Sequence, residues 1–253
     1  MTKTLRHTTL CSALLLLPLF ALAQGSVEDK INAAMKLEYR TQAELDRDAD
    51  REPVKALSFM GLRDDMKVIE FFPAGQAWYT KILAPVLADK GELYVIDSSR
   101  TFDSWGNLLD NPVFKTTHKV LVEASYNREE RRYNVGELNI PINDADLFLN
   151  IREYHNLNTA DKARFNTAVY KALKSGGHYV IIDHTRRHMQ PEAGALFRRE
   201  DPVQVIVDVQ AAGFVLEKTS DMFFEESDEL NLEVGDKSVA GNTDRFFLVF
   251  KKP

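Results

Sequence analysis

Short, nearly continuous runs of hydrophobic residues recur along the chain, separated by longer stretches in which apolar positions repeat at helical spacing. The runs lie within residues 67–72, 92–97, 146–151 and 178–183 and read VIEFF, LYVI, LFL and YVII. Runs of this kind are typical of strands that are buried on both faces. Residues 119–123, KVLVE, are predicted as a further strand.

Amphipathic helices are predicted over residues 78–89, 160–173 and 202–212, and glycines follow each of them. Strands that alternate with helices indicate a parallel sheet with both faces covered. Residues 214–224 and 245–251 are strand-like and only a loop separates them, which predicts an antiparallel pair. The expected fold is therefore α/β: a doubly wound, mostly parallel, seven-stranded Rossmann-like sheet with a C-terminal antiparallel hairpin.

Residues 24–62 are predicted as a helical lead-in to this sheet. A helix is expected over residues 27–39, a polar stretch follows, and a second helix begins at Pro53 and ends at Gly61. We expect the lead-in to cover one edge of the sheet. The remaining residues, 63–253, are predicted to form one domain.

The first 23 residues have the pattern of a secretory signal peptide. Lys3 and Arg6 precede an apolar run over residues 13–23 that ends in small residues. This predicts cleavage after Ala23 and an exported protein, periplasmic or secreted, that is soluble and has no stable membrane insertion afterwards. A retained membrane anchor is the alternative. Cleavage would also remove Cys11, the only cysteine of the chain.

Composition narrows the choice of partner. The chain has 253 residues, of which 44% are hydrophobic, and this suits one large domain with a sizeable core. Its formal net charge of −6 argues against a general attraction to nucleic acid. The expected partner is a small-molecule substrate.

The turn after the first predicted strand holds Pro73-Ala74-Gly75-Gln76-Ala77, followed by Trp78-Tyr79-Thr80. This turn belongs to a set of segments that read VIEFFPAGQAWYTKILAP, GELYVID, DLFLNIREYHNL, ALKSGGHYVIIDH, VQAAGF and TDRFFLVFKKP. In these segments the chain resembles class I S-adenosylmethionine-dependent methyltransferases, most closely an exported branch of them. Members of that branch usually have a run of glycines in this turn. Alanine and glutamine resist a positive φ, so we interpret the turn as a variant cofactor loop in the usual place.

The resemblance implies that residues 63–253 form a methyltransferase-like domain with S-adenosylmethionine as cofactor, and it places the binding residues in this loop and at the strand ends. They are Glu70, Pro73, Gly75, Tyr79, Asp97 and Asn150. Asp97 lies 22 residues after Gly75 and ends the second strand, where a carboxylate can accept hydrogen bonds from ribose hydroxyls. A loop-bracing role for Glu70 and a turn role for Asp97 stay open as alternatives.

Candidate catalytic residues follow the strand over residues 146–151. Arg152, Tyr154 and His155 come directly after it, so they are expected at the carboxyl edge of the sheet beside the cofactor. His155 is the first candidate for a general base, because histidine titrates near neutral pH. Tyr154 could instead stack on the substrate or the cofactor. Capping of the next helix by residues 156–159 would explain part of the same pattern.

Asp183 and His184 follow the last parallel strand, and their role is left open. With His155 they suggest a metal site only weakly, because no compact ligand motif is present, and none is predicted. The basic residues after them are consistent with either a solvated face or a lid that meets an acidic substrate. They are Arg186, Arg187, Arg198 and Arg199.

The resemblance thus implies an enzyme that moves a methyl group from S-adenosylmethionine to an unidentified small substrate by in-line displacement. Two alternatives remain. One is a catalytically impaired methyltransferase fold that serves as a binding or scaffold protein, and the other is an enzyme that uses a different small ligand in the same crevice.

Overall fold

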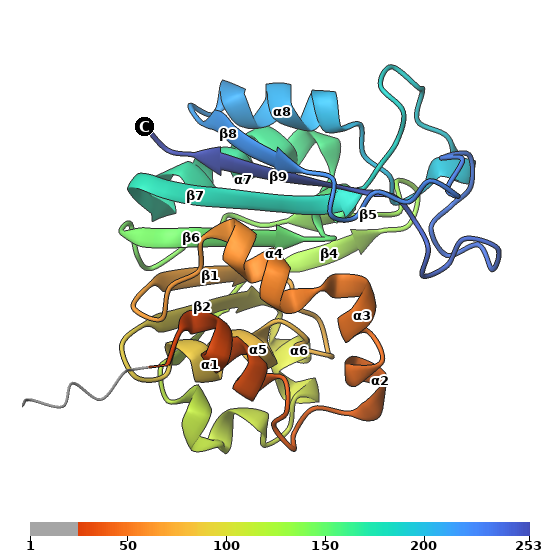
Figure 1. The fold of residues 1–253 in the computed structure, drawn as a ribbon. Helices are drawn as coiled ribbons and strands as arrows, with labels where there is room; N and C mark the ends of the chain where they lie inside the picture. Colours follow the sequence, from red (N-terminus) through yellow and green to blue (C-terminus); the bar gives the residue numbers. More distant parts are fainter. Residues whose placement is uncertain (1–24) are drawn as a thin grey trace, which may run out of the picture.

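A seven-stranded sheet runs through the middle of the structure, a computed structural model that describes residues 25–253 (Figure 1). The order of its strands is β3-β2-β1-β6-β7-β9-β8. The strands are β1 (Lys67–Phe71), β2 (Glu92–Asp97), β3 (Thr117–Leu121), β6 (Ala145–Ile151), β7 (Leu173–His184), β8 (Val215–Ser220) and β9 (Arg245–Lys251).

The first five strands of this order are parallel, and β9 is antiparallel to both of its neighbours, β7 and β8. This confirms the predicted α/β fold and its C-terminal antiparallel hairpin. The chain goes outward from β1 through β2 to β3 and then returns to the other side of β1 as β6. A crevice is expected at this reversal, beyond the carboxyl ends of β1 and β6.

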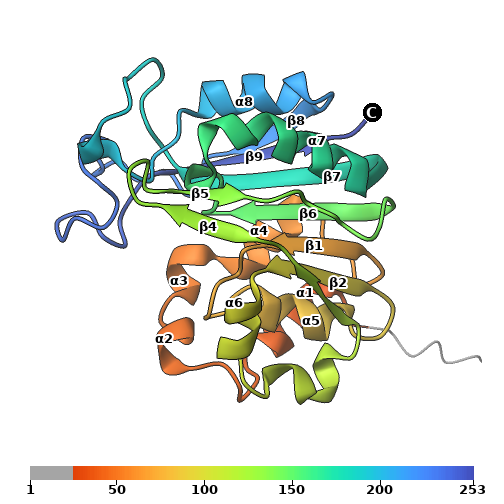
Figure 2. The same cartoon turned by 180° about the vertical axis from the view of Figure 1, so that it is seen from behind.

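Helices cover both faces of the sheet (Figures 1 and 2). The helices α1 (Val27–Ala34), α4 (Pro53–Met60) and α5 (Thr80–Leu87) pack on one face, where their apolar residues join Val68 of β1. On the other face the apolar residues of α7 (Lys162–Ala172) and α8 (Pro202–Ala211) belong to a second core cluster that includes Ile69 of β1. Neighbouring residues of a strand point to opposite faces, so both sides of β1 are buried. The lead-in thus covers a face, which corrects the expectation that it covers an edge.

Two short helices in the polar part of the lead-in, α2 (Gln42–Leu45) and α3 (Asp48–Arg51), lie beside the loop that follows β1. The ammonium group of Lys81 pairs with the Glu44 carboxylate at 2.6 Å, and both side chains are buried. The indole of Trp78 donates to the Glu44 carbonyl at 3.0 Å. These contacts fix α2 and α3 against the start of α5, and they bring Arg51 to the sheet's carboxyl edge.

Some elements depart from the sequence prediction. The helix α1 is shorter than expected, β3 begins two residues earlier, and β7 follows α7 without a loop. Gly176, predicted to end that helix, lies inside β7 with a φ of 78°. The helix α6 (Ser99–Ser104) and the antiparallel pair β4 (Ala124–Asn127) and β5 (Arg132–Val135) were not predicted. Short 3-10 helices are η1 (Leu108–Asp110), η2 (Pro112–Phe114), η3 (Tyr154–Asn156), η4 (Thr159–Asp161) and η5 (Gly194–Leu196).

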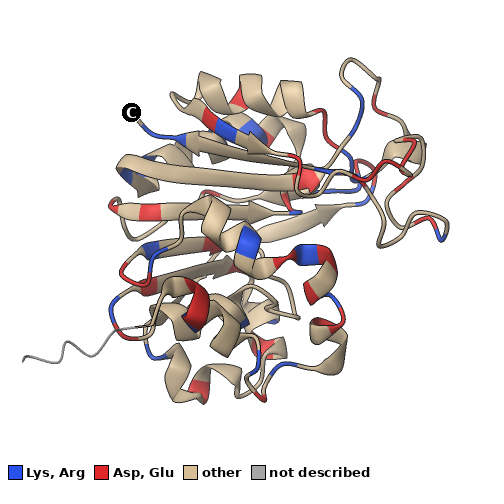
Figure 3. Ribbon diagram, viewed as in Figure 1, with Lys and Arg blue, Asp and Glu red and all other residues tan. Residues whose placement is uncertain are grey.

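Two long loops, residues 185–201 and 221–244, extend past the carboxyl ends of the strands (Figure 1). Figure 3 shows acidic and basic residues interspersed along them. The buried Arg199 guanidinium joins the loops through two hydrogen bonds of 2.9 Å to the Asp228 carboxylate. Arg198 and Glu233 form a second ion pair between them. These pairs hold both loops beside the crevice.

The predicted signal peptide, residues 1–23, lies outside the residues that the structure describes. From residue 25 onward, no helix combines the length and the apolar character that crossing a membrane requires.

Candidate functional site

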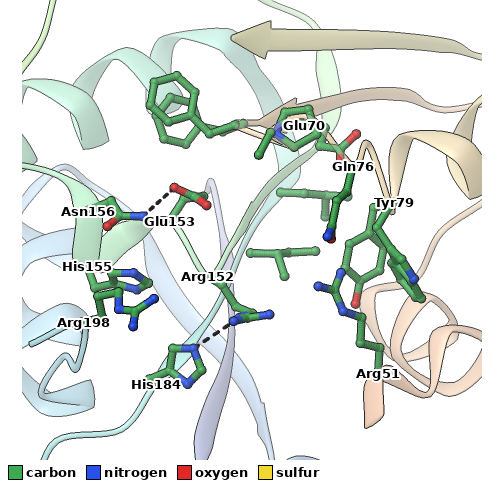
Figure 4. Close-up of a pocket in the computed structure, with 17 residues that line it drawn as sticks. Arg51, Glu70, Gln76, Tyr79, Arg152, Glu153, His155, Asn156, His184 and Arg198 are labelled. Carbon is green, nitrogen blue, oxygen red and sulfur yellow. Dashed lines mark hydrogen bonds between the residues drawn. The ribbon is translucent and has the colours of Figure 1, made fainter. Parts of the chain in front are cut away.

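A cavity of about 220 Å³ opens at the carboxyl ends of β1 and β6, where the strand order reverses (Figure 4). Its walls come from segments that are far apart in the sequence: α3, the loop after β1, the segment after β6, the end of β7, and the loop 185–201. The polar side chains that line it are Arg51, Glu70, Gln76, Tyr79, Arg152, Glu153, His155, Asn156, His184 and Arg198.

The loop after β1 takes a left-handed backbone conformation at residues other than its glycine. Phe72, Ala74 and Ala77 have φ values of 49°, 56° and 50°, whereas Gly75 is not among the residues with positive φ. A positive φ is costly for residues that carry a Cβ, so the rest of the structure must hold this loop in place. The Trp105 indole donates to the Ala74 carbonyl at 3.0 Å, and the Phe72 amide donates to the Ile96 carbonyl at 2.9 Å.

Asp97 braces the same loop. One carboxylate oxygen accepts from the Ala74 amide at 3.2 Å, and the other accepts from the Ser98 amide at 2.7 Å. The residue is 5% exposed and does not line the cavity. A carboxylate has roughly four acceptor positions, and these two bonds leave some of them for a ligand hydroxyl. The ribose-binding role of Asp97 stays a prediction.

Glu70 lies at the end of β1 and is a buried carboxyl group on the cavity wall. Its carboxylate accepts a hydrogen bond of 2.6 Å from the Thr80 hydroxyl. Burial raises the pKa of Glu70 to about 7, although the Thr80 hydrogen bond opposes the shift. Because burial penalises the charged form, a ligand cation beside Glu70 would stabilise its carboxylate.

His155 and Asp183 form a buried pair that the sequence did not connect. The His155 Nδ1 atom lies 2.6 Å from one Asp183 oxygen, and the His155 amide donates to the other oxygen at 2.8 Å. The His184 amide also donates to Asp183, at 2.8 Å. Asp183 thereby fixes the imidazole ring of His155, which lines the cavity, and leaves Nε2 as the nitrogen that can meet a ligand.

His184 is held as a neutral ring beside His155, with 5.8 Å between the centroids of the two rings. Its Nε2 accepts from the Arg152 Nε at 3.2 Å, so the proton belongs on Nδ1, which lies 2.8 Å from the Thr243 hydroxyl. Burial, together with nearby cations such as Arg152, lowers the pKa of His184 well below its ordinary value. His184 therefore positions Arg152 without adding charge to the cavity.

Of the residues expected from the sequence, the cavity brings together five: Glu70, Pro73, Tyr79, Arg152 and His155. The other four, Gly75, Asp97, Asn150 and Tyr154, do not line it.

The side chains of Asn150 and Tyr154 are fully buried and bond inside the protein. The Tyr154 hydroxyl accepts from the Asn166 amide at 3.0 Å beneath α7, and the Asn150 amide reaches the Tyr179 hydroxyl at 3.5 Å. A catalytic role for Tyr154 stays a prediction that these contacts do not favour.

Sequence analysis assigned no site role to Arg51, Gln76, Glu153, His184 and Arg198, which line the cavity. Gln76 stands in the variant loop, the role of His184 was left open, and Arg198 was among the basic residues for which a lid was considered. Glu153 adjoins Arg152 and follows a strand end, which was the available signal. Burial raises the pKa of Glu153 to about 7. For Arg51 there was no signal, because α3 reaches the cavity only through the packing of the lead-in. Within residues 25–253, no three histidine, cysteine, aspartate or glutamate side chains gather as metal ligands.

Comparison with known proteins identifies the fold through solved structures. No family model matches the chain, and no curated protein matches it. Among solved structures, an S-adenosylmethionine-dependent methyltransferase from Aquifex aeolicus superposes with a TM-score of 0.59 at 17% identity, covering 89% of this chain and 98% of that one.

Two further structures show the range of that fold. A putative sarcosine dimethylglycine methyltransferase from Galdieria sulphuraria matches with a TM-score of 0.58 at 11% identity, covering 83% of this chain and 87% of its own. The cyclase SpnF matches with a TM-score of 0.58 at 14% identity, covering 81% and 82%. The chain therefore has the fold of the S-adenosylmethionine-dependent methyltransferases.

Proposed function

We propose that this protein transfers a methyl group from S-adenosylmethionine to a small-molecule acceptor. One observation carries the proposal: the cavity at the strand reversal joins the loop after β1 to the buried His155–Asp183 pair. Ligands of open α/β sheets bind at this place. A histidine held by a carboxylate is also the arrangement that proton removal from an acceptor requires.

The residues around the loop fit the cofactor. The Glu70 carboxyl group suits the ammonium group of its amino-acid end, and Asp97 retains acceptor positions for the ribose. Tyr79 and Pro73 also line the cavity. When bound, the cofactor supplies a methyl group that its sulfonium already activates.

The chain's own residues would supply position, exclusion of water and one proton acceptor. His155 Nε2 would take the proton of an acceptor hydroxyl or amine, while Asp183 stabilises the imidazolium that forms. Arg152, held by His184, would orient the acceptor. The loops joined by Arg199 and Asp228 border the site and limit the access of water.

A second candidate is a binding protein without methyl transfer, and specific observations favour it. Asp97 already accepts two hydrogen bonds from the backbone, and the Gln76 side chain lines the cavity. In addition, SpnF has this fold but is described as a cyclase, so the fold alone does not establish methyl transfer.

The binding of S-adenosylhomocysteine tests the proposal. A ligand that binds only the folded protein stabilises it by about 2.7 kcal/mol at a concentration of 100 times Kd, so millimolar ligand should raise Tm measurably. The Asp97→Ala variant should bind about tenfold more weakly, whereas Asp103→Ala, which removes an exposed carboxylate of α6, should bind as the parent does. Calorimetric titration gives Kd. If the parent protein shows no heat of binding and no change of Tm, the result favours the binding-protein candidate over methyl transfer.

We also propose that the protein is exported, on the strength of the pattern in residues 1–23. The secreted form should begin at Gln24. Sequencing its N-terminus by mass spectrometry checks this, and a secreted protein that still begins at Met1 would contradict cleavage.

A further inference from the structure

Two arginines on the cavity wall lack a carboxylate partner. Arg51 and Arg152 form no ion pair with any described carboxylate, although both are partly buried. The Arg51 guanidinium lies over the Trp78 ring, 4.5 Å from its centroid, and the Arg152 Nε donates to a neutral histidine. Figure 4 shows the two guanidinium groups pointing toward each other across the cavity.

Among the described residues, the arginines that are more fully buried, Arg40, Arg186 and Arg199, each form an ion pair, whereas the partly buried Arg51 and Arg152 share the lack of a carboxylate partner with residues such as Arg245 nearby. Arg40 bonds the Asp48 carboxylate through both terminal nitrogens, and Arg199 does the same with Asp228. Paired guanidinium groups are the rule when arginine leaves water, because an uncompensated buried charge is strongly destabilising.

The neighbourhood of Arg51 adds positive charge. Burial lowers the pKa of Arg51 to about 10; Tyr79 opposes the shift, and Arg152, Arg47 and Arg245 contribute to it. Cations held together in a partly dry cavity repel each other. The presence of these cations in the cavity is explained if a bound anion neutralises their charge.

The acids of the cavity do not restore that balance. The carboxyl groups of Glu70 and Glu153 bond to Thr80 and Asn156, and burial raises the pKa of both to about 7, so each is partly protonated near neutral pH. Asp183 is occupied by His155. The proposed cofactor carries a sulfonium, an ammonium and one carboxylate, so it adds net positive charge. The missing anion must therefore come from the acceptor.

From this geometry we infer that the acceptor substrate carries a carboxylate or phosphate group, which Arg51 and Arg152 bind between them beside His155. That the bound anion is the methyl acceptor rests on the proposed function, whereas the anion site itself does not. Guanidinium groups match both oxyanions through paired hydrogen bonds.

Anion binding to the cofactor-loaded protein tests the inference. The probes are citrate and pyrophosphate, with sodium chloride at equal ionic strength as reference, each added with saturating S-adenosylhomocysteine. At least one probe should raise Tm of the parent and of Arg128→Gln, which replaces an exposed arginine outside the cavity. Arg51→Gln and Arg152→Gln should bind that probe at least tenfold more weakly, with ligand-free Tm no lower than the parent's.

If Arg51→Gln or Arg152→Gln fails to fold, phenylglyoxal labelling of the parent protein provides a second measurement. The anion that binds should protect Arg51 and Arg152 from modification and leave Arg128 reactive, as read by peptide mass spectrometry.

Three results would overturn the inference. The first is that neither probe binds, and the second is equal binding of a probe to the parent and both cavity variants. The third is that S-adenosylhomocysteine abolishes anion binding, since the arginines then hold the cofactor's own carboxylate. By contrast, anion binding that needs both arginines but occurs without any binding of S-adenosylhomocysteine would support the anion site and reject methyl transfer.

Discussion

Replacing Asp183 by alanine is expected to lower the free energy of unfolding by about 3 to 5 kcal/mol, the usual cost of removing one partner from a buried ion pair. The side chain of Asp183 is fully buried and accepts from the His155 amide, the His184 amide and the His155 ring. Its removal would leave all these donors without their acceptor in a region that water does not reach.

Urea titration followed by circular dichroism measures this loss. Asp221→Ala is the matched control, because Asp221 is an exposed aspartate just after β8, and it should change stability by less than about 0.5 kcal/mol. Equal midpoints for the two variants would show that Asp183 contributes little to the fold, and its proposed hold on His155 would then lose its basis.

The second large effect concerns pH. Burial raises the pKa of Glu70 to about 7 from an ordinary value of 4.5. Below pH 4.5 the group is protonated in both states, so it does not affect folding. Between pH 4.5 and 7 the folded state binds more protons than the unfolded state, so stability falls as pH rises. Above pH 7 the loss levels off, at an upper bound of about 3 kcal/mol.

The Glu70→Gln variant removes this titration while its amide oxygen can still accept from Thr80. The variant should match the parent near pH 4.5 and exceed its unfolding free energy by up to about 3 kcal/mol at pH 8. Denaturant titrations at several pH values measure the difference, with Glu38→Gln, an exposed glutamate, as control. A difference that is constant across the range would show that the pKa of Glu70 is the same in the folded and unfolded states.

The sequence predicted the sheet well because its signal is local. Runs such as those in β1, β2 and β6 are apolar on both faces, and only central strands of a covered sheet need that pattern. The pair β4 and β5 was missed because it stands outside this sheet. Its residues are mostly exposed or half-buried, so no apolar run marks it.

The candidate site was predictable only in part, for the same reason. His155 and Glu70 follow or end strands of the sheet, so strand positions alone bring them to one edge. The partnership of His155 with Asp183 depends on the register between β6 and β7, and the position of Arg51 depends on the packing of Glu44 against Lys81. Neither contact leaves a pattern in the chain.

The place of β9 in the sheet has a consequence for biosynthesis. Residues 245–251 form the strand between β7 and β8, so no earlier part of the chain can complete the hydrophobic layers on either side of it. Until this segment has left the ribosome, β7 lacks its antiparallel neighbour and β8 has no partner in the sheet, so their edges stay open in the nascent chain.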